Sequence, residues 1–81
     1  MYYVYILQSI NYPKEHYVGF TEDLKSRIKA HNFGDSAHTK KFKPWKLVCY
    51  FGFADEKSAK QFEYYLKTGS GRAFLRKHFL V

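Results

Sequence analysis

The chain has 81 residues, which suffices for one domain with a modest hydrophobic core, and we expect a single domain over residues 1–81. Hydrophobic residues make up 46% of the sequence and aromatic residues 21%, which excludes a disordered polar chain. Fourteen lysines and arginines against seven acids give a net charge of +7. This charge favours a polyanionic partner such as nucleic acid, although a basic surface also serves solubility.

No stretch approaches the ~20 consecutive apolar residues of a membrane span, and no signal peptide pattern opens the chain, so we expect no membrane association. A single cysteine, Cys49, excludes an internal disulfide and fits a reducing compartment, so we expect a cytoplasmic protein. We interpret Cys49 as a small buried hydrophobe rather than a nucleophile, because no neighbour in the sequence would activate it.

Two apolar runs at the start of the chain predict two strands. Residues Tyr2–Leu7 and His16–Thr21 are rich in β-branched and aromatic side chains, and the polar stretch Gln8–Glu15 between them is typical of a turn. If the strands pair with Tyr5 opposite Tyr17, both phenols lie on one face, because side chains alternate along a strand.

The glycine of the second strand is a candidate phosphate-binding position. In the same register Tyr3 lies opposite Gly19, next to the two phenols. Because glycine has no side chain, Gly19 would leave a gap in which a phosphate or a hydrated metal ion can approach the backbone.

A helix is predicted after the second strand, with Thr21 as its expected N-cap and Gly34 near its end. Arg27 and His31 are four residues apart, so they lie together beside the apolar stripe of this helix. Two tyrosines, an arginine and a histidine are therefore expected to converge.

Residues 35–44 have the composition of an exposed loop. Within it, His38, Lys40 and Lys41 are candidates for contacting a phosphate backbone, with Thr39 as a hydroxyl donor. A merely solvated loop is the alternative.

The remaining elements complete an α/β (α+β) domain. The near-continuous apolar run Trp45–Phe53 predicts a third strand, central and covered on both faces. A second helix is expected from the cap Asp55 to about Thr68, with Gly69 ending it, and a short third helix from Ser70. The prediction is a small, mostly antiparallel three-stranded sheet flanked by three helices, in the order β-β-α-β-α-α.

One carboxylate lies at the margin of the predicted core. Glu63 follows Ala59 by four residues and precedes Leu66 by three, so it borders the face of the second helix that packs on the sheet. An unpaired buried carboxylate is costly, so Glu63 needs a partner. The candidates are an ion pair with Lys60 or Lys67, or a metal ion.

Taken together, these features resemble the GIY-YIG nuclease superfamily, and most of all its small stand-alone bacterial members. The resemblance covers almost the whole chain. Five elements carry it, in this order: Tyr3-Val4-Tyr5, Tyr17-Val18-Gly19, the helix with Arg27 and His31, Pro44-Trp45-Lys46-Leu47-Val48, and Ala59-x-x-x-Glu63.

The resemblance implies a metal-dependent endonuclease that hydrolyses DNA phosphodiester bonds, with RNA left open as a substrate. It implies that Tyr5 is the general base toward water and that Tyr17 is hydrogen-bonded to it and passes the proton on. Arg27 offers a planar, charged fork for phosphate oxygens, and His31 would contact the phosphate or assist the leaving group. Glu63 would hold one Mg²⁺ or Mn²⁺ ion, because Mg²⁺ binds through few carboxylates and keeps several waters. No small-molecule cofactor is expected.

Two other functions remain open. A non-catalytic nucleic-acid-binding module would have the same fold, and a small interaction subunit would use its tyrosines and basic face on a protein partner. Each tyrosine taken alone is more typical of packing than of catalysis. The resemblance implies that larger members obtain target specificity from attached DNA-binding domains, for which 81 residues leave no room. We therefore expect weakly sequence-specific or structure-directed cleavage, or a protein partner that supplies specificity.

Overall fold

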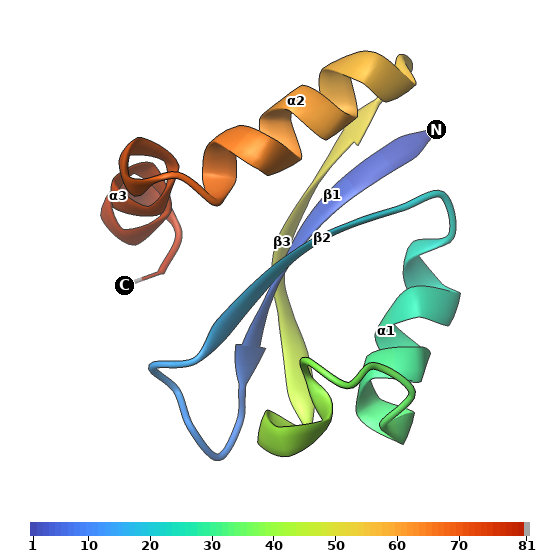
Figure 1. The fold of residues 1–81 in the computed structure, drawn as a ribbon, viewed down its shortest axis with the longest axis vertical. Helices are drawn as coiled ribbons and strands as arrows, with labels where there is room; N and C mark the ends of the chain where they lie inside the picture. The colour runs from blue at the N-terminus through green and yellow to red at the C-terminus, as the bar shows by residue number, and fades with distance from the viewer. Residues whose placement is uncertain (81) are drawn as a thin grey trace.

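The structure is a computed structural model and describes residues 1–80. Within this range the chain forms three strands and three α-helices in the predicted order, which confirms the predicted fold class (Figure 1). The elements are β1 (Tyr2–Ser9), β2 (His16–Thr21), α1 (Leu24–Phe33), a short 3-10 helix η1 (Lys40–Phe42), β3 (Trp45–Phe53), α2 (Glu56–Leu66) and α3 (Gly69–His78).

The strands form one antiparallel sheet of order β2-β1-β3. The central strand is β1, in which residues 4–7 are fully buried. The prediction of a central β3 is wrong: β3 lies at an edge, and Leu47 and Tyr50 on it are exposed. Only one strand of a three-stranded sheet pairs on both sides, and here that strand is β1.

The pairing of β1 with β2 differs by two residues from the predicted register. Tyr5 lies opposite Gly19, and Leu7 lies opposite Tyr17. Because side chains alternate with a period of two, Tyr5 and Tyr17 still share a face. The gap predicted beside Gly19 is filled, since a Cβ at this position would collide with the phenol ring of Tyr5. Gly19 therefore gives Tyr5 room to lie across β2, and the expected approach of a phosphate to its backbone stays a prediction.

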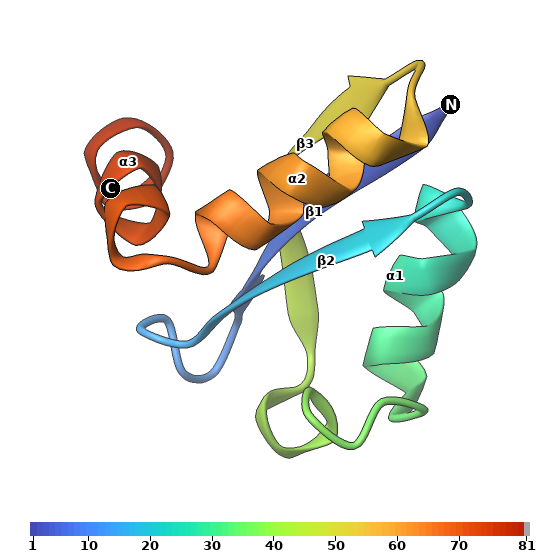
Figure 2. The same cartoon turned by 45° about the horizontal axis from the view of Figure 1, so that its top comes forward.

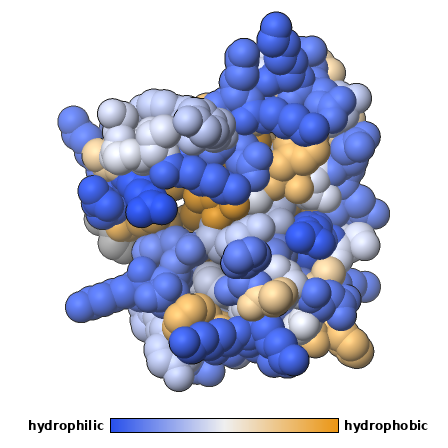
Figure 3. Space-filling model, viewed as in Figure 1, coloured by the Kyte–Doolittle hydropathy of each residue, from blue (hydrophilic) through white to orange (hydrophobic). Residues whose placement is uncertain are grey.

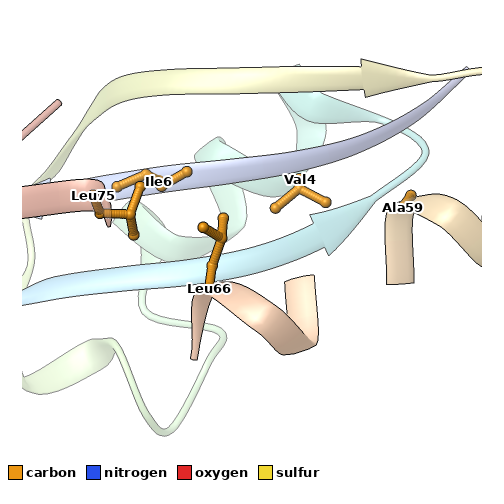
Figure 4. Close-up of a cluster of buried hydrophobic side chains, with 5 residues drawn as sticks. All are labelled: Val4, Ile6, Ala59, Leu66 and Leu75. Atoms are coloured by element: carbon orange, nitrogen blue, oxygen red, sulfur yellow. The ribbon is translucent and has the colours of Figure 1, made fainter. Parts of the chain in front are cut away.

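One face of the sheet packs on α2 and α3. Val4 and Ile6 of β1 meet Ala59 and Leu66 of α2 and Leu75 of α3, and all five side chains are buried (Figure 4). This cluster fixes the position of α2, which carries Glu63.

The opposite face packs on α1 and η1. Tyr5 and Leu7 of β1 and Trp45 of β3 are buried there, with Leu24 and Ile28 of α1 packed against them. Figure 2 shows α1 and α2 on opposite sides of the sheet. The alternation of side chains along β1 thus directs neighbouring residues into two separate cores.

Side-chain caps define where α1 and α2 begin. The N-cap of α1 is Asp23 rather than the predicted Thr21, because the Asp23 carboxylate accepts the backbone N–H of Ser26. Gly34 ends α1 in the left-handed conformation, with φ 93°, as its sequence predicted. Asp55 caps α2, also as predicted.

The junction between α2 and α3 is tighter than predicted. α2 ends at Leu66, and the hydroxyl of Thr68 accepts the backbone N–H of Gly71 as the N-cap of α3. Gly69 begins α3 and does not end α2. Gly71 is buried where α3 meets α2, and a Cβ there would overlap the backbone of Tyr65 and Leu66.

In residues 1–80, no helix combines the length and the apolar character that crossing a bilayer requires. The face shown in Figure 3 is mostly hydrophilic, with apolar side chains in small separate patches.

Candidate active site

Three aromatic rings from three elements meet on the α1 side of the sheet. The hydroxyl of Tyr5 (β1) lies 2.7 Å from Nε2 of His31 (α1). The ring of Tyr17 (β2) lies 4.8 Å from that of His31 and 6.2 Å from that of Tyr5, between centroids. The structure thus brings these predicted site residues together. It differs from the prediction in that the Tyr5 hydroxyl is hydrogen-bonded to His31 rather than to Tyr17.

His31 is fully buried beneath Tyr5, and both of its ring nitrogens have partners. Nε2 contacts Tyr5, and Nδ1 lies 2.7 Å from the hydroxyl oxygen of Thr39. Both ring nitrogens of His31 are thus hydrogen-bonded within the protein, and its expected contact with a phosphate or leaving group stays a prediction. Through Nε2 the imidazole is hydrogen-bonded to the Tyr5 hydroxyl.

Burial dominates the proton affinity of Tyr5. It raises the pKa of the phenol to about 12, against the nearby Arg27 guanidinium, which lowers it. The charge of a deprotonated Tyr17 and that of Glu63 raise it further by smaller amounts. Tyr5 is consequently a neutral phenol at pH 7, and added positive charge is what would release its proton.

Arg27 and His31 respond to the same surroundings in opposite ways. The neighbouring Tyr5 hydroxyl raises the pKa of Arg27, so this half-buried guanidinium stays charged. Burial, followed by the charge of Arg27, lowers the pKa of His31, so the imidazole is neutral at pH 7. The site thus combines one permanent cation with two neutral, hydrogen-bonded rings.

Glu63 has the ion pair that the sequence allowed. Its carboxylate lies 3.0 Å from Nζ of Lys67, and its side chain is 23% exposed. Lys60, the other candidate, pairs with Glu56 instead, at 3.2 Å. Residues 1–80 contain no group of three or more acidic, histidine or cysteine side chains able to cage a metal. A single, partly exposed carboxylate does fit an ion that keeps most of its waters, as Mg²⁺ does.

The loop before β3 is only partly exposed. His38, Lys40 and Lys41 are on the surface, where their predicted phosphate contacts stay predictions. Thr39 is 1% exposed, and its carbonyl accepts the indole N–H of Trp45 at 2.8 Å. The Thr39 hydroxyl lies against the imidazole of His31, and its expected contact with a phosphate stays a prediction.

Two supporting residues were not identified in these roles from the sequence: Thr39 and Asn32. The Asn32 side chain donates to the carbonyl of Trp45 at 3.0 Å and accepts its backbone N–H, which ties the end of α1 to the start of β3. The sequence signal for both contacts was Gly34. A left-handed residue at the end of a helix turns the chain back, so the residues that follow can lie against the last turn of that helix.

The lowered pKa of His31 predicts a loss of stability in acid. Because the folded state disfavours the imidazolium, the contribution of His31 to stability is complete above its ordinary pKa of 6.5 and is lost as the pH falls below that value. Urea unfolding between pH 8 and pH 5 measures this slope in the wild type and in His31→Gln, whose side chain does not titrate. Equal slopes in the two proteins would contradict the prediction, since His16, whose pKa is also lowered, is common to both.

Comparison with known proteins identifies relatives of two kinds. Residues 1–77 match the family model of the GIY-YIG catalytic domain. A structure-specific endonuclease subunit SLX1 from Debaryomyces hansenii is 37% identical over 73 residues, which are 82% of this chain and 21% of that protein. A SLX1 homolog from Giardia intestinalis is 36% identical over 66 residues, 76% of this chain and 18% of that protein. The chain therefore spans about a fifth of the length of these relatives.

Similarity to small bacterial proteins extends over more of their length. A UPF0213 protein from Clostridium perfringens is 43% identical over 68 residues, which are 83% of this chain and 71% of that protein. The solution NMR structure of a UPF0213 protein from Bacillus halodurans has 31% identity and a TM-score of 0.57, covering 95% of this chain and 84% of that one. The match over residues 1–77 and the likeness in sequence and fold to these small bacterial proteins show that the chain belongs to the GIY-YIG family.

Proposed function

We propose that this protein is a metal-dependent endonuclease that hydrolyses phosphodiester bonds in DNA. The observation that carries the proposal is the cluster of Tyr5, Tyr17, Arg27 and His31, with the charge of Glu63 acting on the same phenol. Packing alone does not call for a permanent cation and a buried neutral imidazole around one tyrosine hydroxyl. Membership of a nuclease family and similarity to proteins named structure-specific endonuclease subunits support the same activity.

In this proposal Tyr5 is the general base. Hydrolysis adds water to phosphorus and breaks the bond to the leaving sugar oxygen, so one proton must leave the water and one must reach that oxygen. Tyr5 first gives its own proton to solvent, with Tyr17 helping to pass it on. The Tyr5 oxygen then takes the proton of the attacking water, and solvent supplies the second proton to the leaving oxygen. His31, hydrogen-bonded to the Tyr5 oxygen, holds it in position, and the ring of Tyr17 packs against the imidazole.

Positive charge makes this base available. The guanidinium of Arg27 is always charged, lowers the pKa of Tyr5 and has the fork geometry that fits phosphate oxygens. Glu63 is the residue that would hold a Mg²⁺ or Mn²⁺ ion, which supplies charge neutralisation at the phosphate when bound. Binding would require Glu63 to exchange its ion pair with Lys67 for the metal.

DNA is the proposed substrate because the chain is strongly basic, with a net charge of +7. The exposed His38, Lys40 and Lys41 follow α1 in the chain and are proposed to contact the phosphate backbone. These contacts are independent of base sequence, so cleavage should depend on the structure of the DNA or on a protein partner.

The test is cleavage of branched, supercoiled and single-stranded DNA with Mg²⁺ or Mn²⁺, by the wild type and by Glu63→Gln. This substitution keeps the shape of the side chain and removes the charge that would hold the metal. We expect cleavage to fall at least about 100-fold in Glu63→Gln, because a bound metal contributes several kcal/mol to catalysis. A chelator should abolish wild-type cleavage.

Glu56→Gln is the matched control. It breaks the other glutamate–lysine pair of α2, at the same spacing, and should leave cleavage unchanged. Equal activity of Glu63→Gln and Glu56→Gln would overturn the assignment of the metal ligand. If the wild type binds DNA in a salt-sensitive way but cleaves none of these substrates, the protein is a nucleic-acid-binding module and not a nuclease.

A further inference from the structure

A groove lies between the start of β2 and α3, and we call it the α3 groove. Residues 14–18, from the β1–β2 loop and the start of β2, line it together with the end of α2 and with α3. Its volume is about 680 Å³. Figures 1 and 2 both show α3 and the β1–β2 loop at the same end of the molecule. Segments far apart in the sequence therefore build one concave surface.

The floor of the α3 groove is apolar. Leu66 is fully buried and Leu75 is 2% exposed, while Val18 and Leu80 are partly buried. All four side chains belong to the core cluster between the sheet and the helices α2 and α3, or pack against it. The floor is thus an edge of the core that the protein leaves open.

The rim of the groove is strongly basic. It carries one acid, Glu15, and four cations: Lys14, Lys67, Arg72 and Arg76. The two arginines are exposed and lie four residues apart, on one side of α3. Within residues 1–80 neither of them forms an ion pair with a carboxylate. Like charges gathered around one hollow repel each other, and a bound polyanion would relieve that repulsion.

Two residues of the groove also belong to the candidate active site. The ring of Tyr17 lies 4.8 Å from that of His31, between centroids. Nζ of Lys67 lies 3.0 Å from the carboxylate of Glu63. The groove therefore begins where the candidate site ends, so a strand bound at the site can continue into it.

We propose that the α3 groove binds the sugar-phosphate backbone of DNA next to the bond that is cut, with Arg72 and Arg76 paired to phosphates. The DNA backbone alternates a charged phosphate with a sugar whose carbons are apolar. A basic rim above an apolar floor matches both parts, whereas a basic surface that serves only solubility needs no such floor. The guanidinium fork suits phosphate oxygens. The proposal rests on the proposed function for the cut itself, but binding can be measured without cleavage.

The experiment measures binding of a fluorescently labelled branched DNA in the presence of a chelator, over a range of salt concentrations. The variant is the double substitution Arg72→Gln with Arg76→Gln. We expect its affinity at low salt to be roughly 10–100-fold below that of the wild type. The slope of log affinity against log salt should fall by roughly 1–2, because each lost phosphate contact removes about one unit. Both side chains are exposed, so thermal unfolding should show an intact fold.

The matched control is Lys25→Gln with Lys29→Gln. These lysines are exposed, have the same four-residue spacing on α1 and do not line the groove. The control loses the same charge and should bind DNA much more tightly than the arginine variant. Glu15→Gln, which removes the acid of the rim, should bind more tightly than the wild type.

Equal losses of affinity in the two double variants would overturn the proposal, because net charge alone would then explain binding. Wild-type affinity in the arginine variant would also overturn it, whatever the cleavage activity. If the arginine variant alone binds weakly and no protein cleaves DNA, the groove stands as a DNA-binding surface and only the proposed nuclease fails.

Discussion

Tyr5→Phe is expected to remove nearly all cleavage while the protein remains folded. The substitution deletes only the hydroxyl, so the buried ring still packs over Gly19. Losing a positioned general base costs about 10²–10⁴-fold in rate. The unpaired Nε2 of His31 should cost about 1–3 kcal/mol of stability. Single-turnover cleavage and thermal unfolding measure the two effects separately.

Tyr50→Phe is the matched control for this prediction. Tyr50 pairs with Tyr5 across the β1–β3 ladder and is 53% exposed, so its hydroxyl should be dispensable. Wild-type cleavage should also rise with pH above neutrality, because a phenol with a pKa of about 12 is mostly protonated at pH 7. Cleavage by Tyr5→Phe at the rate of Tyr50→Phe would contradict the assignment of the base.

Gly71→Ala is expected to cause the largest loss of stability of any glycine-to-alanine substitution in this chain. The new Cβ would overlap the carbonyl of Tyr65 and the Cα of Leu66, which are backbone atoms and cannot rotate aside. α3 must therefore move off α2, and we expect a loss of about 3 kcal/mol. For a domain of this size each kcal/mol lowers the melting temperature by roughly 4–8 °C.

Gly69→Ala, two residues earlier in α3, is its control. A Cβ at position 69 meets nothing within 4 Å, so this variant should unfold at the wild-type temperature or slightly above it. Calorimetry of the two variants checks the prediction. A melting temperature for Gly71→Ala within a few degrees of that for Gly69→Ala would mean that the α2–α3 contact is not as close as described.

Patterns local in the sequence predicted the elements well, and pairings between distant segments less well. The strand β3 begins and ends where its apolar run does, and Asp55 and Gly34 act as the caps that their residue types favour. The register of β1 with β2 was wrong by two residues, because both registers put Tyr5 and Tyr17 on one face and the loop between the strands does not choose between them.

The candidate site divides in the same way. The four-residue spacing of Arg27 and His31 and the facing of the two tyrosines follow from helix and strand periodicity, so their convergence could be predicted. The burial of His31 and its contact with Thr39 could not, because they depend on how the loop after Gly34 folds back on α1. Only tertiary structure distinguishes an exposed threonine from an enclosed one.

The division of the core between the two faces of β1 bears on whether a partly folded chain could cleave DNA. Arg27 and His31 depend on the α1 side, whereas Glu63 depends on the α2–α3 side. A chain that has folded one side of its sheet therefore holds an incomplete set of catalytic groups. Under the proposed function, a molecule that has folded only one side of its sheet therefore cannot cut DNA.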